Sequence, residues 1–343
     1  MMMIVNNGKR GDDMRKFLFI LSAILTALTI IVCLNMPKAL ATSKDKDSLT
    51  QSKTSPVKPK DFKSSSNLED DPTGYWTKDR MKKAIPNDPT HSNNDTHPKN
   101  NKSSSLTEEK PSDISDPVAP DSSSDAKTNV VVPSTAGKVF YSYDRKDYVC
   151  SASAINNDYK NLVITAGHCV HGGKDKGWHS NIAFAPAYYN GSLPYGIWNW
   201  KEARTFNAWI NNSHFSHDQA FFTVYPKTKN LINTVGGNGL STGYGKDQPS
   251  VRIFGWPAES PFDGQLPYFC DGASTSAGLF STDAKMPCDM NGGASGGPWL
   301  REIIDENLGY VFAVTSRRST SGTPTLFATP NSQDVRTMFD LME

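Results

Sequence analysis

The stretch Gly292-Gly293-Ala294-Ser295-Gly296-Gly297-Pro298 decides how the rest of the chain is interpreted. A serine hydroxyl is a weak nucleophile, so an enzyme that uses one needs a base beside it and donors for the oxyanion that its attack creates. The glycines around Ser295 permit a tight turn that can direct the amides of Gly293 and Ser295 toward one point. Taken alone, a glycine-rich stretch with one serine is just as typical of an ordinary loop.

Two earlier stretches supply the partners that such a serine needs. The first, Thr165-Ala166-Gly167-His168-Cys169, follows an apolar run and predicts a buried strand that ends at a histidine. The second, Asp218-Gln219-Ala220-Phe221-Phe222, places a carboxylate at the start of another apolar strand. His168, Asp218 and Ser295 occur in that order, 218 − 168 = 50 and 295 − 218 = 77 positions apart.

These three stretches together resemble the chymotrypsin-type serine peptidases, whose order of histidine, aspartate and serine differs from that of subtilisins and α/β-hydrolases. The resemblance covers about residues 135–343. Within the family, Ile253-Phe254-Gly255-Trp256-Pro257 and Cys288-Asp289-Met290-Asn291-Gly292-Gly293 are similar to the bacterial secreted branch related to glutamyl endopeptidases.

The resemblance implies a role for each residue. Ser295 would attack the scissile carbonyl, His168 would take its proton, and Asp218 would hold the imidazole. The amides of Gly293 and Ser295 would form the oxyanion hole. We therefore expect a monomeric serine endopeptidase that acts on protein or peptide substrates, with no metal or other cofactor.

Two interpretations of the specificity pocket stay open. Asp289 lies six positions before Ser295, where trypsin-like members carry the carboxylate that binds arginine or lysine. Alternatively, Thr315, Ser316 and Arg317 could bind an acidic side chain, and Asp289 would then be a solvated loop residue.

One departure from the family concerns activation. Ala294 stands before the nucleophile, where animal peptidases place an aspartate that pairs with a freed N-terminal amine. Alanine cannot form that pair, so we expect the site to be ordered without it and removal of residues 42–134 to act sterically if at all.

Short apolar or alternating runs separated by Gly, Asn, Asp, Pro and Ser predict an all-β fold. The resemblance implies two six-stranded antiparallel barrels, about 135–235 and 236–331, and a short C-terminal helix over 332–343. Helical spacing behind Ser332 supports that helix. The predicted strands are Val139–Tyr143, Tyr148–Ile155, Leu162–Thr165, Ile182–Tyr189, Ala220–Tyr225, Val251–Trp256, Tyr310–Thr315 and Thr325–Ala328.

The cysteines indicate an oxidising compartment. Four remain when Cys33 is set aside, and four cysteines allow three pairings. By analogy with the family we expect Cys150–Cys169, which would fix the loop of His168, and Cys270–Cys288, which would fix the approach to Ser295. The absence of any Cys-x-x-Cys pair argues against zinc.

The N-terminal residues 1–41 are typical of a secretory signal peptide. A basic start precedes the apolar run Phe17–Leu34, and Ala39-Leu40-Ala41 offers a cleavage site after Ala41. The apolar run is nearly long enough to span a bilayer, so an uncleaved membrane anchor is the alternative. Either way the protein is expected to be extracellular, secreted or tethered to the cell surface.

Residues 42–134 differ in composition from the rest. Leu, Ile, Val and Phe occupy 11 of 93 positions, well below the roughly 20% at which a packed core becomes implausible. We therefore predict a disordered propeptide or tether. Around Tyr75-Trp76, with Met81 and Ile85, a short docking helix is the competing interpretation.

The chain of 343 residues has a formal net charge of +1, which gives no electrostatic argument for nucleic acid. Two other classes of function stay open. The domain could be an inactive binding module on the cell surface, or an esterase that turns over small esters but not peptides.

Overall fold

The computed structural model describes residues 49–57, 71–91, 109–121, 132–279, 281–305 and 308–343. The predicted signal peptide over 1–41 lies outside these residues. Within them, no helix is both long and apolar enough to cross a membrane.

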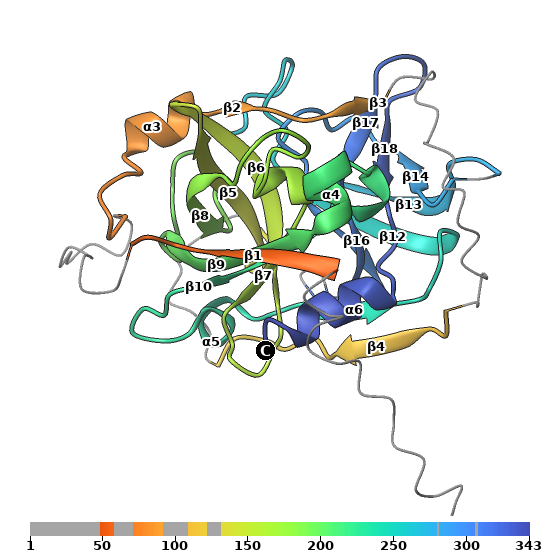
Figure 1. Cartoon of the computed structure of the whole chain (residues 1–343), viewed down its shortest axis with the longest axis horizontal. Coiled ribbons are helices and arrows are strands. Elements are labelled where there is room, and N and C mark those ends of the chain that lie inside the picture. The colour runs from red at the N-terminus through yellow and green to blue at the C-terminus, as the bar shows by residue number, and fades with distance from the viewer. Residues whose placement is uncertain (1–48, 58–70, 92–108, 122–131, 280, 306–307) are drawn as a thin grey trace, which may run out of the picture. The chain divides into compact units, whose positions relative to one another are not determined.

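The first half of the domain is a closed antiparallel barrel (Figure 1). Its strands pair in the order β5-β6-β7-β10-β9-β8 and back to β5. They are β5 (Ala136–Tyr143), β6 (Lys146–Ile155), β7 (Leu162–Thr165), β8 (Ser180–Pro186), β9 (Trp198–Phe206) and β10 (Ala220–Val224).

Period-two alternation divides the side chains of these strands between two cores. In β10, Phe222 packs inside the barrel with Val163 of β7. Its neighbour Phe221 faces the other way, into a cluster that includes Val311 and Met338 of the second half. β7 and β10 are buried along their whole length. Strands that are buried on both faces have continuous apolar runs in the sequence, which is why these two strands show one.

The second half is a sheet with the path β17-β18-β14-β13-β12-β15-β16-β11. Its own core gathers Ile253, Met286, Trp299, Phe312 and Leu326. The strands are β11 (Gly239–Thr242), β12 (Gln248–Gly255), β13 (Tyr268–Ser276), β14 (Ala284–Pro287), β15 (Pro298–Arg301), β16 (Tyr310–Val314), β17 (Arg317–Ser319) and β18 (Thr325–Ala328).

The predicted C-terminal helix is present as α6 (Gln333–Asp340). Ser332 caps it by accepting a hydrogen bond from the amide of Asp334. Val335 and Met338 are buried in the cluster shared by the two halves. The all-β fold with a closing helix is thus confirmed, and all eight predicted strands are found. Shorter helices are η2 (Gly167–Cys169), α4 (Asn207–Asn212), η3 (Phe215–His217) and α5 (Leu231–Val235).

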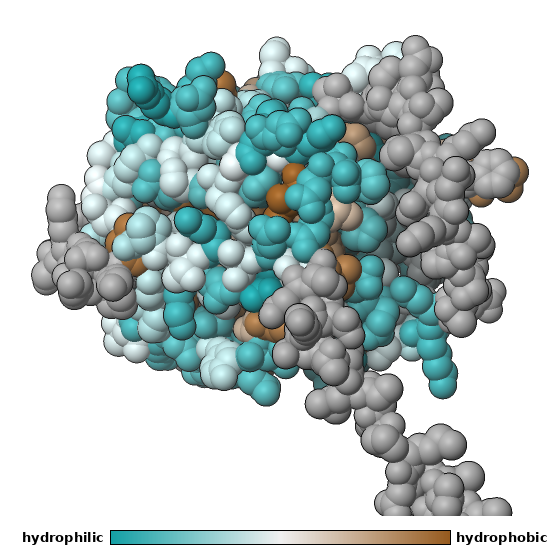
Figure 2. Space-filling view, in the orientation of Figure 1, coloured by the Kyte–Doolittle hydropathy of each residue, from teal (hydrophilic) through white to brown (hydrophobic). Residues whose placement is uncertain are grey.

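Both predicted disulfides are present. Cys150–Cys169 joins β6 to the turn after β7, and Cys270–Cys288 joins β13 to the loop after β14. On the face shown in Figure 2, hydrophilic residues predominate and hydrophobic ones form small separate patches.

The expected disorder of 42–134 is wrong for the described stretches 49–57, 71–91 and 109–121, which form strands and a helix. Its segments add strands to sheet edges: β1 pairs with β9, β2 with β6, β3 with β17 and β4 with β11. A segment with few apolar side chains needs no core of its own when the backbone of another domain supplies its hydrogen bonds. These strands are β1 (Thr50–Thr54), β2 (Ile85–Pro86), β3 (Thr90–His91) and β4 (Ser112–Ser115).

The docking helix that the sequence left open is α3 (Lys78–Lys83). Trp76 and Met81 are each only 3% exposed. The Trp76 ring lies 5.3 Å from that of Phe140 in β5, and its Nε1 donates to the carbonyl of Asn181 at 2.7 Å. These contacts fix Trp76 and α3 on the outside of the first barrel.

Candidate active site

His168 lies on the single turn η2 that follows β7. The disulfide partner Cys169 holds this turn against β6. There is little room beside it, because a Cβ on Gly167 would lie 3.1 Å from Oδ1 of Asp218 and 3.0 Å from Oγ1 of Thr205. The small residue before the histidine therefore allows the carboxylate to approach closely.

The carboxylate of Asp218 holds His168 at two points. The ring Nδ1 lies 2.8 Å from Oδ2, and the backbone amide of His168 donates to Oδ1, also at 2.8 Å. Asp218 is 1% exposed. This arrangement fixes the tautomer in which Nδ1 carries a proton, leaving Nε2 as the reactive nitrogen.

Ser316 was predicted for the specificity pocket, but the structure places it against Asp218. Its hydroxyl donates to Oδ2 of Asp218 at 2.7 Å, across the two halves of the domain. The carboxylate thus accepts a third hydrogen bond, from a residue just before β17. The sequence could not reveal this, because a hydroxyl at a strand end can face either side.

Ser295 lies in the turn before β15 and is 1% exposed. Its carbonyl accepts from the amide of Ser151 in β6 at 2.7 Å, and Sγ of Cys169 lies 3.8 Å from the same oxygen. The next residue, Gly296, has a positive φ of 80°. A Cβ there would lie 2.1 Å from Oγ1 of Thr165, so the turn fits against the end of β7 only because it has glycine.

The predicted oxyanion donor Gly293 adopts a φ of 100°. Its carbonyl accepts from the hydroxyl of Ser151 at 2.9 Å, which fixes the direction of the turn. Its amide donates to Oδ2 of Asp88 at 2.7 Å. Asp88 belongs to the segment 71–91, and sequence analysis did not single it out.

Asp88 also faces His168. Its Oδ1 lies 3.8 Å from Nε2 of His168, and each side chain is 5% exposed. At this distance the two atoms are not hydrogen-bonded, and neither has a hydrogen-bond partner among the described residues. Nε2 therefore faces a buried carboxylate on the side away from Asp218.

Burial alone would lower the pKa of His168, but its two carboxylate partners outweigh that effect. Asp218 has the larger influence and Asp88 adds to it, so that the pKa rises from 6.5 to about 9. With Asp88 in place, His168 is held as an imidazolium near neutral pH.

The other predicted pocket residues are largely engaged elsewhere. Oγ1 of Thr315 accepts from Nε1 of Trp299 at 2.9 Å. Arg317 is 1% exposed and forms an ion pair with the equally buried Asp283. Asp289 is exposed. The charge of Arg317 is therefore neutralised, and Asp289 is the candidate that remains open to solvent.

Two clusters of described residues place three metal-binding side chains within 4.8 Å, Cys150–His168–Cys169 and Cys270–Cys288–Asp289. In both, the two sulfurs are joined as a disulfide. Each cluster therefore offers one unmodified ligand, which does not make a metal site.

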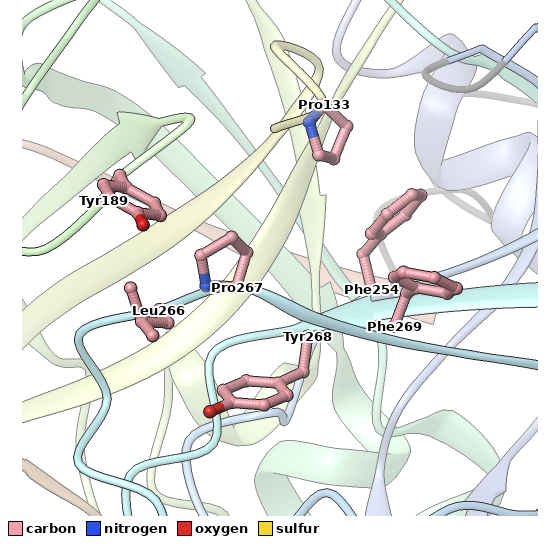
Figure 3. A pocket seen from close by; sticks show the side chains of 7 residues that line it. All are labelled: Pro133, Tyr189, Phe254, Leu266, Pro267, Tyr268 and Phe269. Atoms are coloured by element: carbon pink, nitrogen blue, oxygen red, sulfur yellow. The ribbon is translucent and has the colours of Figure 1, made fainter. Parts of the chain in front are cut away.

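An apolar hollow of about 220 Å³ lies apart from these groups (Figure 3). Pro133, Tyr189 and Phe254 line it together with the run Leu266–Phe269. None of the candidate catalytic residues contributes to it, so we assign it no part in the reaction.

No family model matches the sequence, and no curated relative matches it. Several solved structures are similar to it. The thermostable serine protease AL20 from an extremophilic microorganism is 30% identical, with a TM-score of 0.58 over 61% of this chain and 97% of that one. The protease Anisep from Arthrobacter nicotinovorans is also 30% identical, with a TM-score of 0.58 over 62% and 96%.

A Glu endopeptidase solved in complex with MPD is 17% identical, with a TM-score of 0.50 over 68% of this chain and 97% of the other, and shows the shared fold. The closed barrel, second sheet and C-terminal helix define a trypsin-like protein. The chain belongs to the chymotrypsin-like serine peptidases.

Proposed function

We propose that the protein is a secreted serine endopeptidase that hydrolyses peptide bonds through the triad Ser295, His168 and Asp218. The observation that carries the proposal is the buried pair of His168 and Asp218 beside the turn that presents Gly293 and Ser295. The protease neighbours support peptide substrates, and the two disulfides support an extracellular location.

In the proposed mechanism, Nε2 of His168 takes the proton of the Ser295 hydroxyl as its oxygen attacks the peptide carbonyl. The amides of Gly293 and Ser295 stabilise the oxyanion, and the imidazolium then protonates the leaving amine. Water releases the acyl group by the same steps in reverse. Asp218, held by Ser316, keeps Nδ1 protonated and stabilises the imidazolium.

The neutralised Arg317 bears on substrate choice. Because its guanidinium pairs with Asp283, it supplies little net charge for an acidic side chain. We propose that Asp289 favours arginine or lysine before the cleaved bond. A panel of peptides with Arg, Glu, Phe or Ala at that position tests this, and faster cleavage after Glu would refute it.

The test of the proposed function is hydrolysis of casein and peptide amides by the full chain and by residues 128–343, each paired with Ser295→Ala. For residues 128–343 we expect amide hydrolysis that Ser295→Ala abolishes. Turnover of small esters without amides by this shortened chain would favour the esterase, and a folded shortened chain without either activity would favour the binding module.

A further inference from the structure

Residues 85–91 run from one half of the domain to the other (Figure 1, the orange strands β2 and β3). Asp88, between these strands, contacts Gly293 and faces His168 in the candidate active site. At one end Ile85 and Pro86 pair with Tyr148 and Val149 of β6. At the other end β3 pairs with β17, immediately after Ser316. Both pairings are parallel. The backbone between these two strands is thereby fixed over the catalytic groups, with Asp88 near its middle.

The group that this segment presents to the site is a side-chain carboxylate rather than a peptide carbonyl. Oδ2 of Asp88 takes the hydrogen bond of the Gly293 amide, and Oδ1 faces Nε2 of His168. A carboxylate is already negative and has no leaving amine, so Ser295 cannot form an acyl-enzyme with it. The segment can therefore fill the oxyanion position without being a substrate.

Local sequence and packing keep this carboxylate in place. Asp88 stands between Pro86 and Pro89, and proline fixes φ at about −65°. Pro86 fits against the glycine turn, because a Cβ on Gly292 would lie 3.0 Å from it. Upstream, the buried Trp76 ties the segment to the barrel.

The same carboxylate changes the state of the base. A general base must be neutral to accept a proton, and Asp88 contributes to the raised pKa of His168. Asp88 would thus oppose catalysis twice, by filling the oxyanion position and by favouring the protonated imidazole.

We propose that residues 71–91 are a built-in inhibitor and that the Gly293 amide with His168 forms a carboxylate site, which Asp88 occupies. This inference rests on the proposed function of Ser295 and His168. Removal of the segment, or loss of its carboxylate, opens the site.

The test compares the full chain with four variants for the rate at which a fluorophosphonate labels the protein, followed by intact mass. Asp88→Ala removes the carboxylate, Asp88→Asn keeps an acceptor oxygen without the charge, and Trp76→Ala loosens the anchor. Asp79→Asn is the matched control, since Asp79 is an exposed acid of the same segment that pairs with Lys83 at 2.8 Å.

We expect Asp88→Ala and Trp76→Ala to raise the labelling rate about tenfold to a hundredfold. Asp88→Asn should give a smaller gain, and Asp79→Asn none. Misfolding would lower labelling, so a gain in rate cannot come from damage to the fold.

If Asp88→Ala labels at the same measurable rate as the parent, the inhibitor role of Asp88 is wrong and the proposed function stands. If only Trp76→Ala gains, the segment blocks the site by bulk, and the carboxylate claim is wrong. If the parent and every variant are folded but never labelled at Ser295, the proposed function itself fails, and the inhibitor proposal fails with it.

Discussion

At the scale of single residues, the site depends on where two carboxylates lie around one imidazole. Asp218 contacts Nδ1 and Asp88 faces Nε2 of His168. The first contact is what a general base requires, whereas the second stabilises the protonated ring. The pKa of His168 therefore reports directly whether Asp88 is in place.

We predict that His168 in the full chain titrates near pH 9 and that Asp88→Asn lowers this pKa. Because the folded pKa is raised above 6.5, the electrostatic stabilisation is complete below about pH 6.5 and is lost as pH rises through about 9. Proton NMR of the imidazole measures this. An unchanged pKa in Asp88→Asn, with Asp79→Asn as control, would contradict the placement of Asp88.

Ser316 is predicted to be a positioning residue. Ser316→Ala removes the 2.7 Å hydrogen bond to Asp218, and we expect kcat to fall roughly tenfold with KM unchanged. Ser316→Thr keeps the hydroxyl and should restore much of the rate. A change in preference among Arg, Glu and Ala substrates, with kcat intact, would instead return Ser316 to the specificity pocket.

Sequence could identify His168, Asp218 and Ser295 because each lies in a short stretch whose residue types the chemistry demands. It could not identify Asp88, whose contact with Gly293 joins residues 205 positions apart. Nothing in the residues around an aspartate in a polar segment indicates that it makes such a long-range contact. Nor could sequence show that Arg317 is neutralised by Asp283, 34 positions earlier.

At the scale of elements, prediction depended on apolar periodicity. β7 and β10 were found because all their residues are buried. β13 was missed because most of its side chains are exposed or half-buried, so it shows no apolar pattern. β1 and β4 were missed for a related reason: edge strands of a polar region are held mainly by backbone pairing, which leaves little trace in side-chain type.

The two disulfides provide a test at this scale. Each spans a similar length, 19 and 18 residues, so replacing either pair with serines should lower the free energy of unfolding by about 3 kcal/mol. Loss of Cys150–Cys169 should also slow labelling of Ser295 more than loss of Cys270–Cys288 does, because Cys169 adjoins both His168 and the Ser295 carbonyl. Urea unfolding and labelling together check this. Equal effects on labelling from both pairs would contradict the assignment.

At the scale of the whole domain, polar groups buried between the halves couple their folding. Nδ2 of Asn238 donates to Ser153 of β6 at 2.9 Å, and its Oδ1 accepts from Gly309 at 3.0 Å. Lys138 of β5 is 1% exposed and donates to the carbonyl of Gly264 in the second half at 2.8 Å. Such contacts join residues far apart in the sequence, so periodicity could not predict them.

Lys138 should make stability depend on pH. Burial lowers its pKa from 10.5 to about 7, although Asp263 partly opposes the shift. Between these values the unfolded chain binds a proton that the folded protein does not, so Lys138 makes stability rise with pH, by up to about 1.4 kcal/mol per unit. Lys138→Met should remove that contribution. Parallel stability curves for parent and variant from pH 7 to 10 would show that Lys138 is not buried as described.

The central claim is that Ser295 is the nucleophile of a site that His168 and Asp218 complete. The most direct measurement is to locate the fluorophosphonate on the labelled Asp88→Ala chain by peptide mass spectrometry, with Ser295→Ala in the same background as control. We predict one adduct, on the peptide that contains Ser295, and none in the control. A folded chain labelled at another residue, or equal labelling of the control, would contradict it.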